Sequence, residues 1–283
     1  MLAQFFEYEF LRNTFYTGLL IGFIAPLLGT FVVVRRLSLL ADALSHVTLG
    51  GIAFGLFMEK KYGILFLTPF YSGMGFSVLG SIFIERLRTV YKGFQEIAIP
   101  IILSGGVGLS VIFISLANGF NTDLYNYLFG SVSAVSERDL WTIIIITIIV
   151  LTAITLFYKE LFMLSFDEEH AVVSGIHAKI IHFIFIVLTA LVIAASLRIV
   201  GVLLVSSLMT LPVAASIRLA KGFKQTILFA VIFGELSVII GLISGYYFEI
   251  PPGGTIVMIS ILILIITISV NKVRGYFTRK RAI

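Results

Sequence analysis

The feature that most constrains the fold is a series of apolar runs long enough to cross a lipid bilayer. About 20 mostly apolar residues are needed to span roughly 30 Å of hydrocarbon. Such segments occur at 14–34, 38–58, 64–84, 97–117, 140–157, 179–196, 199–219, 226–248 and 255–271. Because lipid offers no partner for open backbone groups, each segment is expected to be helical. The sequence therefore predicts an all-α, polytopic membrane bundle of about nine spans (eight to ten), forming one domain over residues 1–283.

The composition supports this prediction. Of the 283 residues, 59% are hydrophobic and only 12% are charged, whereas soluble domains carry about 25% charged residues. The net charge is +5, but Lys and Arg are dispersed among the connectors, so the charge does not indicate nucleic-acid binding. The chain has no cysteine, which excludes disulfides and thiolate metal sites.

The basic connectors predict an orientation. With nine spans, one side of the membrane receives the connectors at 35–38, 85–96 and 221–224, together with the tail at 271–283. Lys and Arg in short loops mark the cytoplasmic side. The segments 118–137 and 249–254 then lie outside, and the connector 58–63, which has two lysines, is an exception. We therefore expect a multi-pass membrane protein with these basic connectors in the cytoplasm.

Three ionisable residues lie well inside the predicted spans: Asp42, His46 and Glu235. Each costs about 2.5–3.5 kcal/mol on insertion scales, and such residues usually face the bundle interior. Asp42 and His46 are four residues apart and share one helical face, so they offer oxygen and nitrogen ligands to a divalent metal ion. Two ligands are too few, but Glu235 or the same pair from a second copy would complete a site. Alternatively, Asp42 and His46 neutralise each other through a hydrogen bond, and burial keeps Glu235 protonated.

Several polar side chains are candidates for lining a path through the membrane, namely Ser45, Ser206, Met209 and Thr210. The competing interpretation is that the hydroxyls bond back to their own helices. Pro212 is expected to interrupt the span at 199–219. Backbone freed at membrane depth is tolerated only where it is buried in protein or faces a wet cavity.

The longest predicted cytoplasmic connector, residues 158–179, is amphipathic and carries charges of both signs. It is either a solvated helix or a surface on which a soluble partner docks. The chain has no P-loop motif G-x-x-x-x-G-K-[ST], so ATP-driven transport would require a nucleotide site on another chain. The H-E-x-x-H and G-x-S-x-G motifs are also missing from the sequence, and no enzymatic activity is indicated.

Four stretches together resemble a known family. "GTFVVVRRLSLLADALSHVTLGGIAFG" (29–55) is similar to the signature of the permease subunits of zinc, manganese and iron ABC importers, the ABC-3 family, with Asp42 and His46 at the matching positions. "ELFMLSFDEEHAVVSGI" (160–176) resembles the segment that couples these permeases to their ATPases. "RIVGVLLVSSLMTLPVAASIRLA" (198–220) is similar to their broken span, and "YYFEIPPGGTIVM" (246–258) to the external turn before the last helix. In the coupling segment, the matched residues are Asp167, Glu168, Ala171, Gly175 and Ile176.

The resemblance implies a homodimeric permease whose two copies share one translocation path. Two cytoplasmic ATPase subunits would dock on the coupling segments, and an extracellular metal-binding protein would deliver the ion. Asp42, His46 and Glu235 are then expected to contact the ion or gate its path. The chain itself would be no enzyme and would bind no cofactor; Zn²⁺ or Mn²⁺ would be its cargo.

The sequence after His46 favours zinc among the metals of this family. It continues "SHVTLGGIAFG", which resembles the zinc branch, whereas manganese members more often have a proline where Gly50 stands. A manganese or iron importer remains the alternative. A proton-coupled secondary metal transporter is the alternative from another class, with Asp42, His46 and Glu235 as its proton relay.

Overall fold

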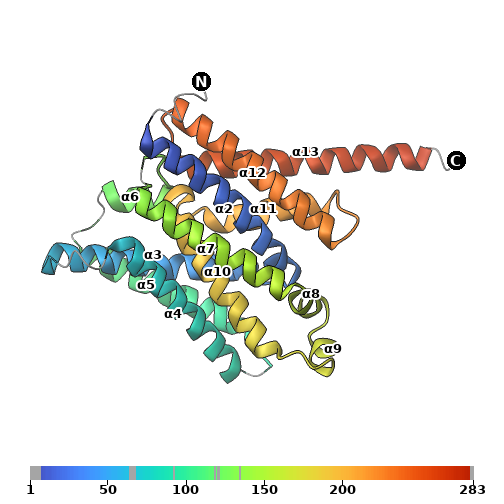
Figure 1. Ribbon diagram of the computed structural model, residues 1–283, viewed down its shortest axis with the longest axis horizontal. Coiled ribbons are helices and arrows are strands. Elements are labelled where there is room, and N and C mark those ends of the chain that lie inside the picture. The colour runs from blue at the N-terminus through green and yellow to red at the C-terminus, as the bar shows by residue number, and fades with distance from the viewer. Residues whose placement is uncertain are drawn as a thin grey trace.

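Each of the nine predicted apolar segments corresponds to a helix in the described part of the chain. A computed structural model describes residues 8–63, 68–91, 93–117, 119, 122–133 and 135–280 (Figure 1). The long helices are α2 (Glu9–Val34), α3 (Ser38–Tyr62), α4 (Pro69–Val90), α5 (Ala98–Leu116), α7 (Glu137–Leu156), α10 (Ala178–Val200), α11 (Val205–Ile217), α12 (Phe223–Tyr247) and α13 (Pro252–Lys280). Short helices connect them: η1 (Gln95–Ile97), α6 (Thr122–Phe129), α8 (Tyr158–Phe166) and α9 (Glu168–Val173). No strand occurs among these residues, so the all-α prediction is confirmed.

Seven of the described helices are long and apolar enough to cross a membrane: α2, α3, α5, α7, α10, α12 and α13. The other two predicted spans are not among these seven helices. The third was predicted from residue 64, but residues 64–67 lie outside the described part; α4 begins at Pro69 and has 22 residues, so it is long enough but not apolar enough to be counted. The seventh is α11, with 13 residues, which at 1.5 Å per residue is about 20 Å long and too short to cross the hydrocarbon alone.

The interruption expected at Pro212 is wrong, because the helix breaks earlier. Pro212 lies inside α11, where a proline removes one backbone hydrogen bond and does not have to end the helix, as membrane helices tolerate. The chain instead turns at Gly201, between α10 and α11, with φ 82° and ψ 156°. Only glycine adopts this backbone conformation readily. The predicted span 199–219 is therefore the end of α10, a four-residue turn and the short helix α11.

The backbone groups freed at this turn find partners on α6 and just after it. Val202 N donates to Tyr127 O at 2.9 Å, and Ser131 N donates to Arg198 O at 3.1 Å. A Cβ atom at Gly201 would collide with the carbonyl of Leu128. Because the backbone of α6 and of the residues just after it supplies these partners, the break is held by protein contacts and not by lipid.

Replacing Gly201 with alanine is expected to destabilise the protein. The conformation at Gly201 is nearly restricted to glycine, so we expect a loss of about 2 kcal/mol or more. Thermal unfolding in detergent, followed by the loss of monodisperse protein, measures the change. The matched control is Gly75→Ala on α4, where an added Cβ meets nothing within 4 Å and alanine favours the helix. Equal midpoints for Gly201→Ala and Gly75→Ala would contradict the prediction.

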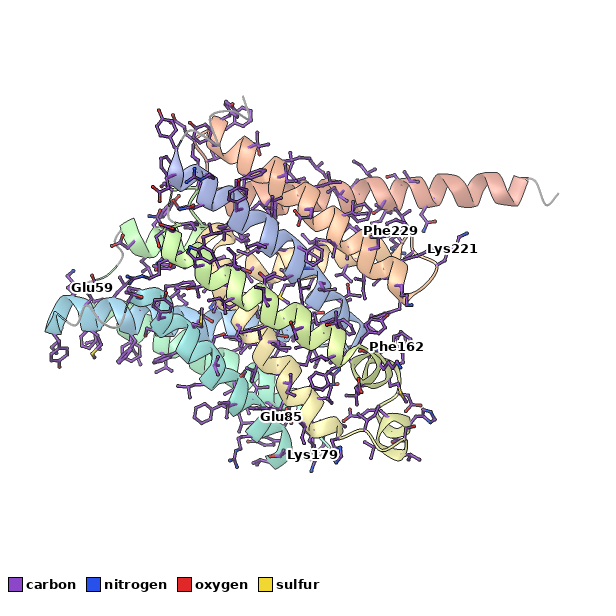
Figure 2. All side chains as sticks on the ribbon, in the orientation of Figure 1. Glu59, Glu85, Phe162, Lys179, Lys221 and Phe229 are labelled. Carbon is purple, nitrogen blue, oxygen red and sulfur yellow. The ribbon has the colours of Figure 1, made fainter. Side chains whose placement is uncertain are left out.

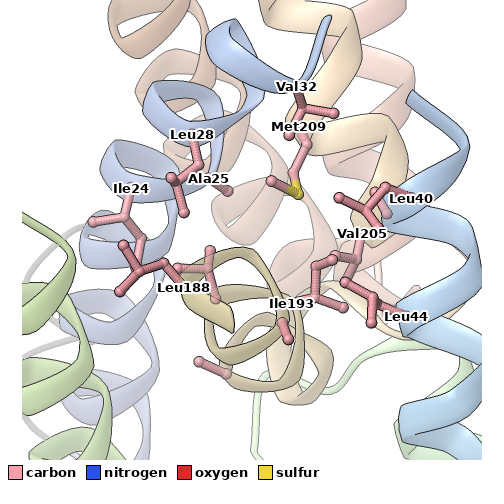
Figure 3. Packing of buried hydrophobic residues seen from close by; sticks show 14 of the residues in the cluster. Ile24, Ala25, Leu28, Val32, Leu40, Leu44, Leu188, Ile193, Val205 and Met209 are labelled. Carbon is pink, nitrogen blue, oxygen red and sulfur yellow. The ribbon is translucent and has the colours of Figure 1, made fainter. Parts of the chain in front are cut away.

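The core lies where α2, α3, α10 and α11 meet, and Figure 3 shows its side chains. From α2 it receives Ile24, Ala25, Leu28 and Val32, which interdigitate with residues of the other three helices: Leu40, Leu44, Leu188, Ile193, Val205 and Met209. α2 and α11 approach closely at Gly29, where a Cβ atom would collide with the carbonyl of Met209. This contact holds α11 against α2, the helix that precedes α3, on which Asp42 lies.

The connectors separate into two ends of the bundle. One end, which we call the basic end, holds the turn at 35–37, residues 93–97, the segment 157–177 and the loop 218–222 (Figure 1). At the opposite end, Lys60 Nζ donates to Ala117 O and Thr14 Oγ1 to Val132 O. Figure 2 places Glu85 and Lys179 at the basic end and Glu59 at the opposite end. The basic connectors therefore lie at one end, as predicted, and the cytoplasmic location of that end stays a prediction.

Candidate functional site

Asp42 and His46 lie on the least buried face of α3. Both side chains are half-buried, and Leu39, on the same face, is 56% exposed. The opposite faces of α3 pack on α4 and α5. In a single copy of the chain, the side chains of Asp42 and His46 therefore face outward from the bundle and are only partly covered by it.

Neither side chain has a hydrogen-bond partner in the described part of the chain. In particular, Asp42 and His46 do not bond each other, so the alternative in which they neutralise one another is wrong for this structure. Only the backbone of His46 takes part in a bond, as its carbonyl accepts from Ser110 Oγ on α5 at 3.0 Å. The oxygen atoms of Asp42 and the ring nitrogens of His46 are therefore available to an external ligand.

The backbone that carries the pair is held between two neighbouring helices. Val47 packs on Gly80 of α4 and on Gly106 of α5. A Cβ atom at Gly106 would lie 2.8 Å from Val47 N, so only glycine permits this approach. The pair thus lies on a helix that packs against α4 on one side and α5 on another, while the face that carries the pair is less covered.

Glu235 lies on α12 and is not brought together with the pair within one chain. Its carboxylate packs on α2, where a Cβ atom at Gly22 would lie 3.4 Å from Glu235 Oε2. That oxygen is buried and has no hydrogen-bond partner among the described residues. The described residues hold no group of three or more His, Asp or Glu side chains that could bind a metal ion. A site completed by Glu235 inside a single copy is therefore not formed in this structure.

The four candidates for lining a path are enclosed to different degrees. Ser45 and Met209 are buried, and Ser45 Oγ donates to Ala41 O at 2.8 Å within its own helix. Thr210 and Ser206 are half-buried, and Thr210 Oγ1 donates to Ser206 O at 2.9 Å. The hydroxyls of Ser45 and Thr210 thus bond back to their helices, and Met209 belongs to the core. A place on the translocation path stays a prediction for these residues.

The predicted coupling segment forms two short helices, α8 and α9, at the basic end. Asp167 stands between them and caps α9, because its Oδ1 accepts a hydrogen bond from His170 N at 2.8 Å. A carboxylate at this position also interacts favourably with the helix dipole. Ala171 is fully buried, whereas Glu168 is exposed.

The end of α9 explains the spacing of Ala171, Gly175 and Ile176. Ile176 N donates to Ala171 O at 3.1 Å, and Gly175 N donates to Val172 O at 3.0 Å. These two bonds form a Schellman motif, which needs a left-handed residue after the helix, and Gly175 has φ 87°. Asp167 and Gly175 therefore shape the two ends of α9, so that the helix presents Glu168 at a defined place.

The sequence did not indicate two clusters of ionisable side chains, one at each end of α10. At the end opposite to the basic end, Arg198 Nη1 lies 2.8 Å from Asp139 Oδ2. At the basic end, Arg35 Nη2 lies 2.7 Å from His182 Nδ1. Burial lowers the pKa of the Arg35 guanidinium to about 10, so it remains a cation at neutral pH. His182 and Arg198 were recognisable as ionisable residues near span ends, where long side chains can reach the interface, but their partners are far away in the sequence.

Comparisons with known proteins agree with the fold and the motifs. Residues 7–271 match the ABC 3 transport family. The chain is 36% identical to the "Probable metal transport system membrane protein" of Treponema pallidum over 94% of this chain and 97% of that protein. It is 32% identical to the manganese transport system membrane protein MntC of Listeria monocytogenes (100% and 98% covered) and 31% identical to the high-affinity zinc uptake system membrane protein ZnuB of Haemophilus influenzae (92% and 97% covered).

A solved structure shows the same architecture. The chain is similar to PsaBC from Streptococcus pneumoniae in complex with Fab, with a TM-score of 0.80 and 30% identity over 94% of this chain and 95% of that one. The resemblance of the four motifs is thereby confirmed over nearly the whole length of the chain. The chain belongs to the ABC 3 transport family: it is the multi-pass permease subunit of an ABC transporter of the bacterial cell membrane, and not an enzyme.

Proposed function

We propose that this permease of a metal-ion ABC importer carries zinc into the cell, and that Asp42 and His46 from two copies of the chain bind the ion on its path. The observation that carries the proposal is that the side chains of Asp42 and His46 are accessible and have no hydrogen-bond partner among the described residues. Both are half-buried on the least buried face of α3, which we call its open face. An ionisable pair in a membrane helix is costly, and a ligand that arrives from outside the chain accounts for it.

The number of ligands favours zinc. One copy supplies one carboxylate and one imidazole, and two copies related by a two-fold axis supply two of each. Four oxygen and nitrogen ligands suit the tetrahedral coordination of zinc, whereas manganese favours octahedral sites rich in oxygen. A site assembled from two mobile halves also binds its ion loosely enough to release it.

The face of α5 that points away from α3 supports a second copy at this place. Gly105 and Gly108 are exposed there, and a Cβ atom at either position would meet nothing within 4 Å. Ile101 and Ile112 on the same helix are 39% and 55% exposed. Small residues let membrane helices approach closely, so α5 is suited to pack against its copy beside the open face of α3.

The remaining partners follow from the fold and the family. Two cytoplasmic ATPase subunits dock on the α8–α9 segments, and an extracellular metal-binding protein delivers the ion at the opposite end. ATP binding and hydrolysis then alternate the access of the pair between the two sides. Membership of the ABC 3 transport family favours this cycle over proton-coupled transport.

Manganese is the second candidate for the cargo. The relatives that cover nearly the whole chain are named for different metals, at 32% identity for a manganese system and 31% for a zinc system. Similarity at this level does not separate the two ions, whereas the ligand count of the proposed site favours zinc.

The test is transport by the complete complex. The permease is purified with its ATPase, reconstituted into vesicles and supplied with its metal-binding protein and ATP. Uptake of radioactive zinc and of radioactive manganese is measured separately and in competition. We expect ATP-dependent zinc uptake that exceeds manganese uptake at equal free concentrations. A preference for manganese would transfer the proposal to the second candidate, and uptake of neither ion would overturn it.

A further inference from the structure

A partly buried polar cluster joins the turn after α2 to the helices α4 and α10 at the basic end of the bundle. It consists of Arg35 in the turn after α2, Glu85 and Arg88 on α4, and His182 on α10. His182 is only 6% exposed. Figure 2 shows Glu85 near the end of α4, close to the start of α10, where Lys179 is labelled.

The direction of the contacts can be derived from the donors. A guanidinium only donates, so Arg35 Nη2 donates to His182 Nδ1 at 2.7 Å, and the proton of the neutral ring is on Nε2. This Nε2 faces Glu85 Oε2 at 3.5 Å, and Arg88 Nη1 lies 3.6 Å from the same oxygen. Arg35 Nη1 is buried and has no hydrogen-bond partner in the described residues. Arg35 Nη1 and His182 Nε2 are thus both donors without a hydrogen-bond partner among the described residues.

The coupling segment borders this cluster across an open space. A cavity of about 450 Å³ is lined by Arg35, Arg88, His182 and Glu168, the first residue of α9. Glu168 is exposed and forms no ion pair with any residue that the structure describes. The Glu168 carboxylate, which forms no ion pair with these residues, and the Arg35 guanidinium therefore line the same cavity from two separate elements.

Arg35 is linked directly to the helix that carries the proposed metal site. Only residues 35–37 separate α2 from α3, and this turn is tight, with Arg36 N donating to Val33 O and Leu37 N to Val32 O. Asp42 follows in the second turn of α3. Because this turn is short and hydrogen-bonded, we expect a displacement of Arg35 to move the start of α3 and with it Asp42.

We propose that Glu168 and Arg35 are positioning residues through which the ATPase subunits act on the metal site, an inference that rests on the proposed function. When the ATPases press α9 towards the bundle, Glu168 closes the cavity and pairs with Arg35. The turn 35–37 and α3 follow, and Asp42 and His46 move relative to their copies. Such a contact, present in one state and absent in the other, is what a ligand-driven change requires.

The first test measures coupling in the reconstituted complex with the variant Glu168→Gln. We expect the zinc transported per ATP hydrolysed to fall about tenfold, within the usual range of coupling energies. The matched control is Glu169→Gln, the next residue of the same helix, which is also exposed and does not line the cavity. Equal ratios for the two variants would overturn the inference. A wild-type complex that transports no metal would instead refute the proposed function.

The second test does not depend on transport. The chain has no cysteine, so the pair Glu168→Cys and Arg36→Cys can be crosslinked with a short bismaleimide without background. Arg36 is exposed and lines the same cavity, so the polar cluster stays intact. We expect more crosslinked product with ATP bound than without nucleotide, and no such change for Glu169→Cys with Arg36→Cys. Unchanged crosslinking of the Glu168 pair would overturn the inference even if coupling falls.

Discussion

The variants Asp42→Asn and His46→Ala are each expected to abolish ATP-driven zinc uptake while the complex still assembles. Each substitution changes both copies, so the proposed site keeps only two of its four ligands. Loss of residues that merely orient metal ligands reduces affinity or activity about 10–100-fold, so loss of a ligand is expected to reduce uptake by about 100-fold or more.

The folded state should tolerate both changes. Asp42 and His46 are half-buried and make no side-chain hydrogen bond in the described structure, so their removal leaves no buried partner behind. The measurement is zinc uptake by the reconstituted complex, normalised to the amount of assembled complex. Glu137→Gln is the control, because Glu137 is an exposed carboxylate in the first turn of α7. Wild-type uptake by an assembled Asp42→Asn complex would remove the pair from the path.

Glu235→Gln provides a third arm of the same experiment. Glu235 packs against α2 and is not grouped with the pair in one chain. If its only role is that of a polar side chain packed against α2, glutamine replaces it with little loss of uptake. A loss as large as that of Asp42→Asn would show that Glu235 acts on the ion, and the site would then need more than the two α3 helices.

The spans were predictable because hydrophobic length is a local property. Each apolar run corresponds to a helix, since a membrane segment must satisfy its backbone within itself. The break in the seventh span was not predictable in the same way. Pro212 suggested the wrong position, because a proline removes a single bond, whereas Gly201 allows a turn whose freed groups are bonded by α6, more than 70 residues earlier in the sequence.

The candidate site was predictable to the extent that it depends on spacing along one helix. Asp42 and His46 are four residues apart and indeed share a face of α3. The cluster of Arg35, Glu85 and His182 depends instead on the packing of α2, α4 and α10, and nothing in the spacing of these residues indicates that they meet. The same reason explains Glu235, whose distance from the pair is set by the position of α12 on α2.

The coupling segment offers the other large effect. In α9 the motif residues Asp167 and Gly175 form the two caps of a six-residue helix, and a helix this short is not stable without its caps and packing. The double variant Asp167→Ala with Gly175→Val removes one cap and places a β-branched residue at φ 87°. We expect α9 to unfold and the ATPase to bind about 30-fold more weakly, because the two losses together cost about 2 kcal/mol.

Binding of the ATPase to the detergent-solubilised permease measures this effect, together with the thermal midpoint of the permease alone. The matched control is Gly63→Val at the end of α3, because Gly63 has φ 63° and an added side chain meets nothing within 4 Å. It introduces the same kind of backbone strain at the opposite end of the bundle. Because α9 adds little to the core, the double variant should keep its midpoint while losing the ATPase, and Gly63→Val should keep the ATPase. Undiminished binding by the double variant would show that the ATPase recognises a surface other than the α8–α9 segment.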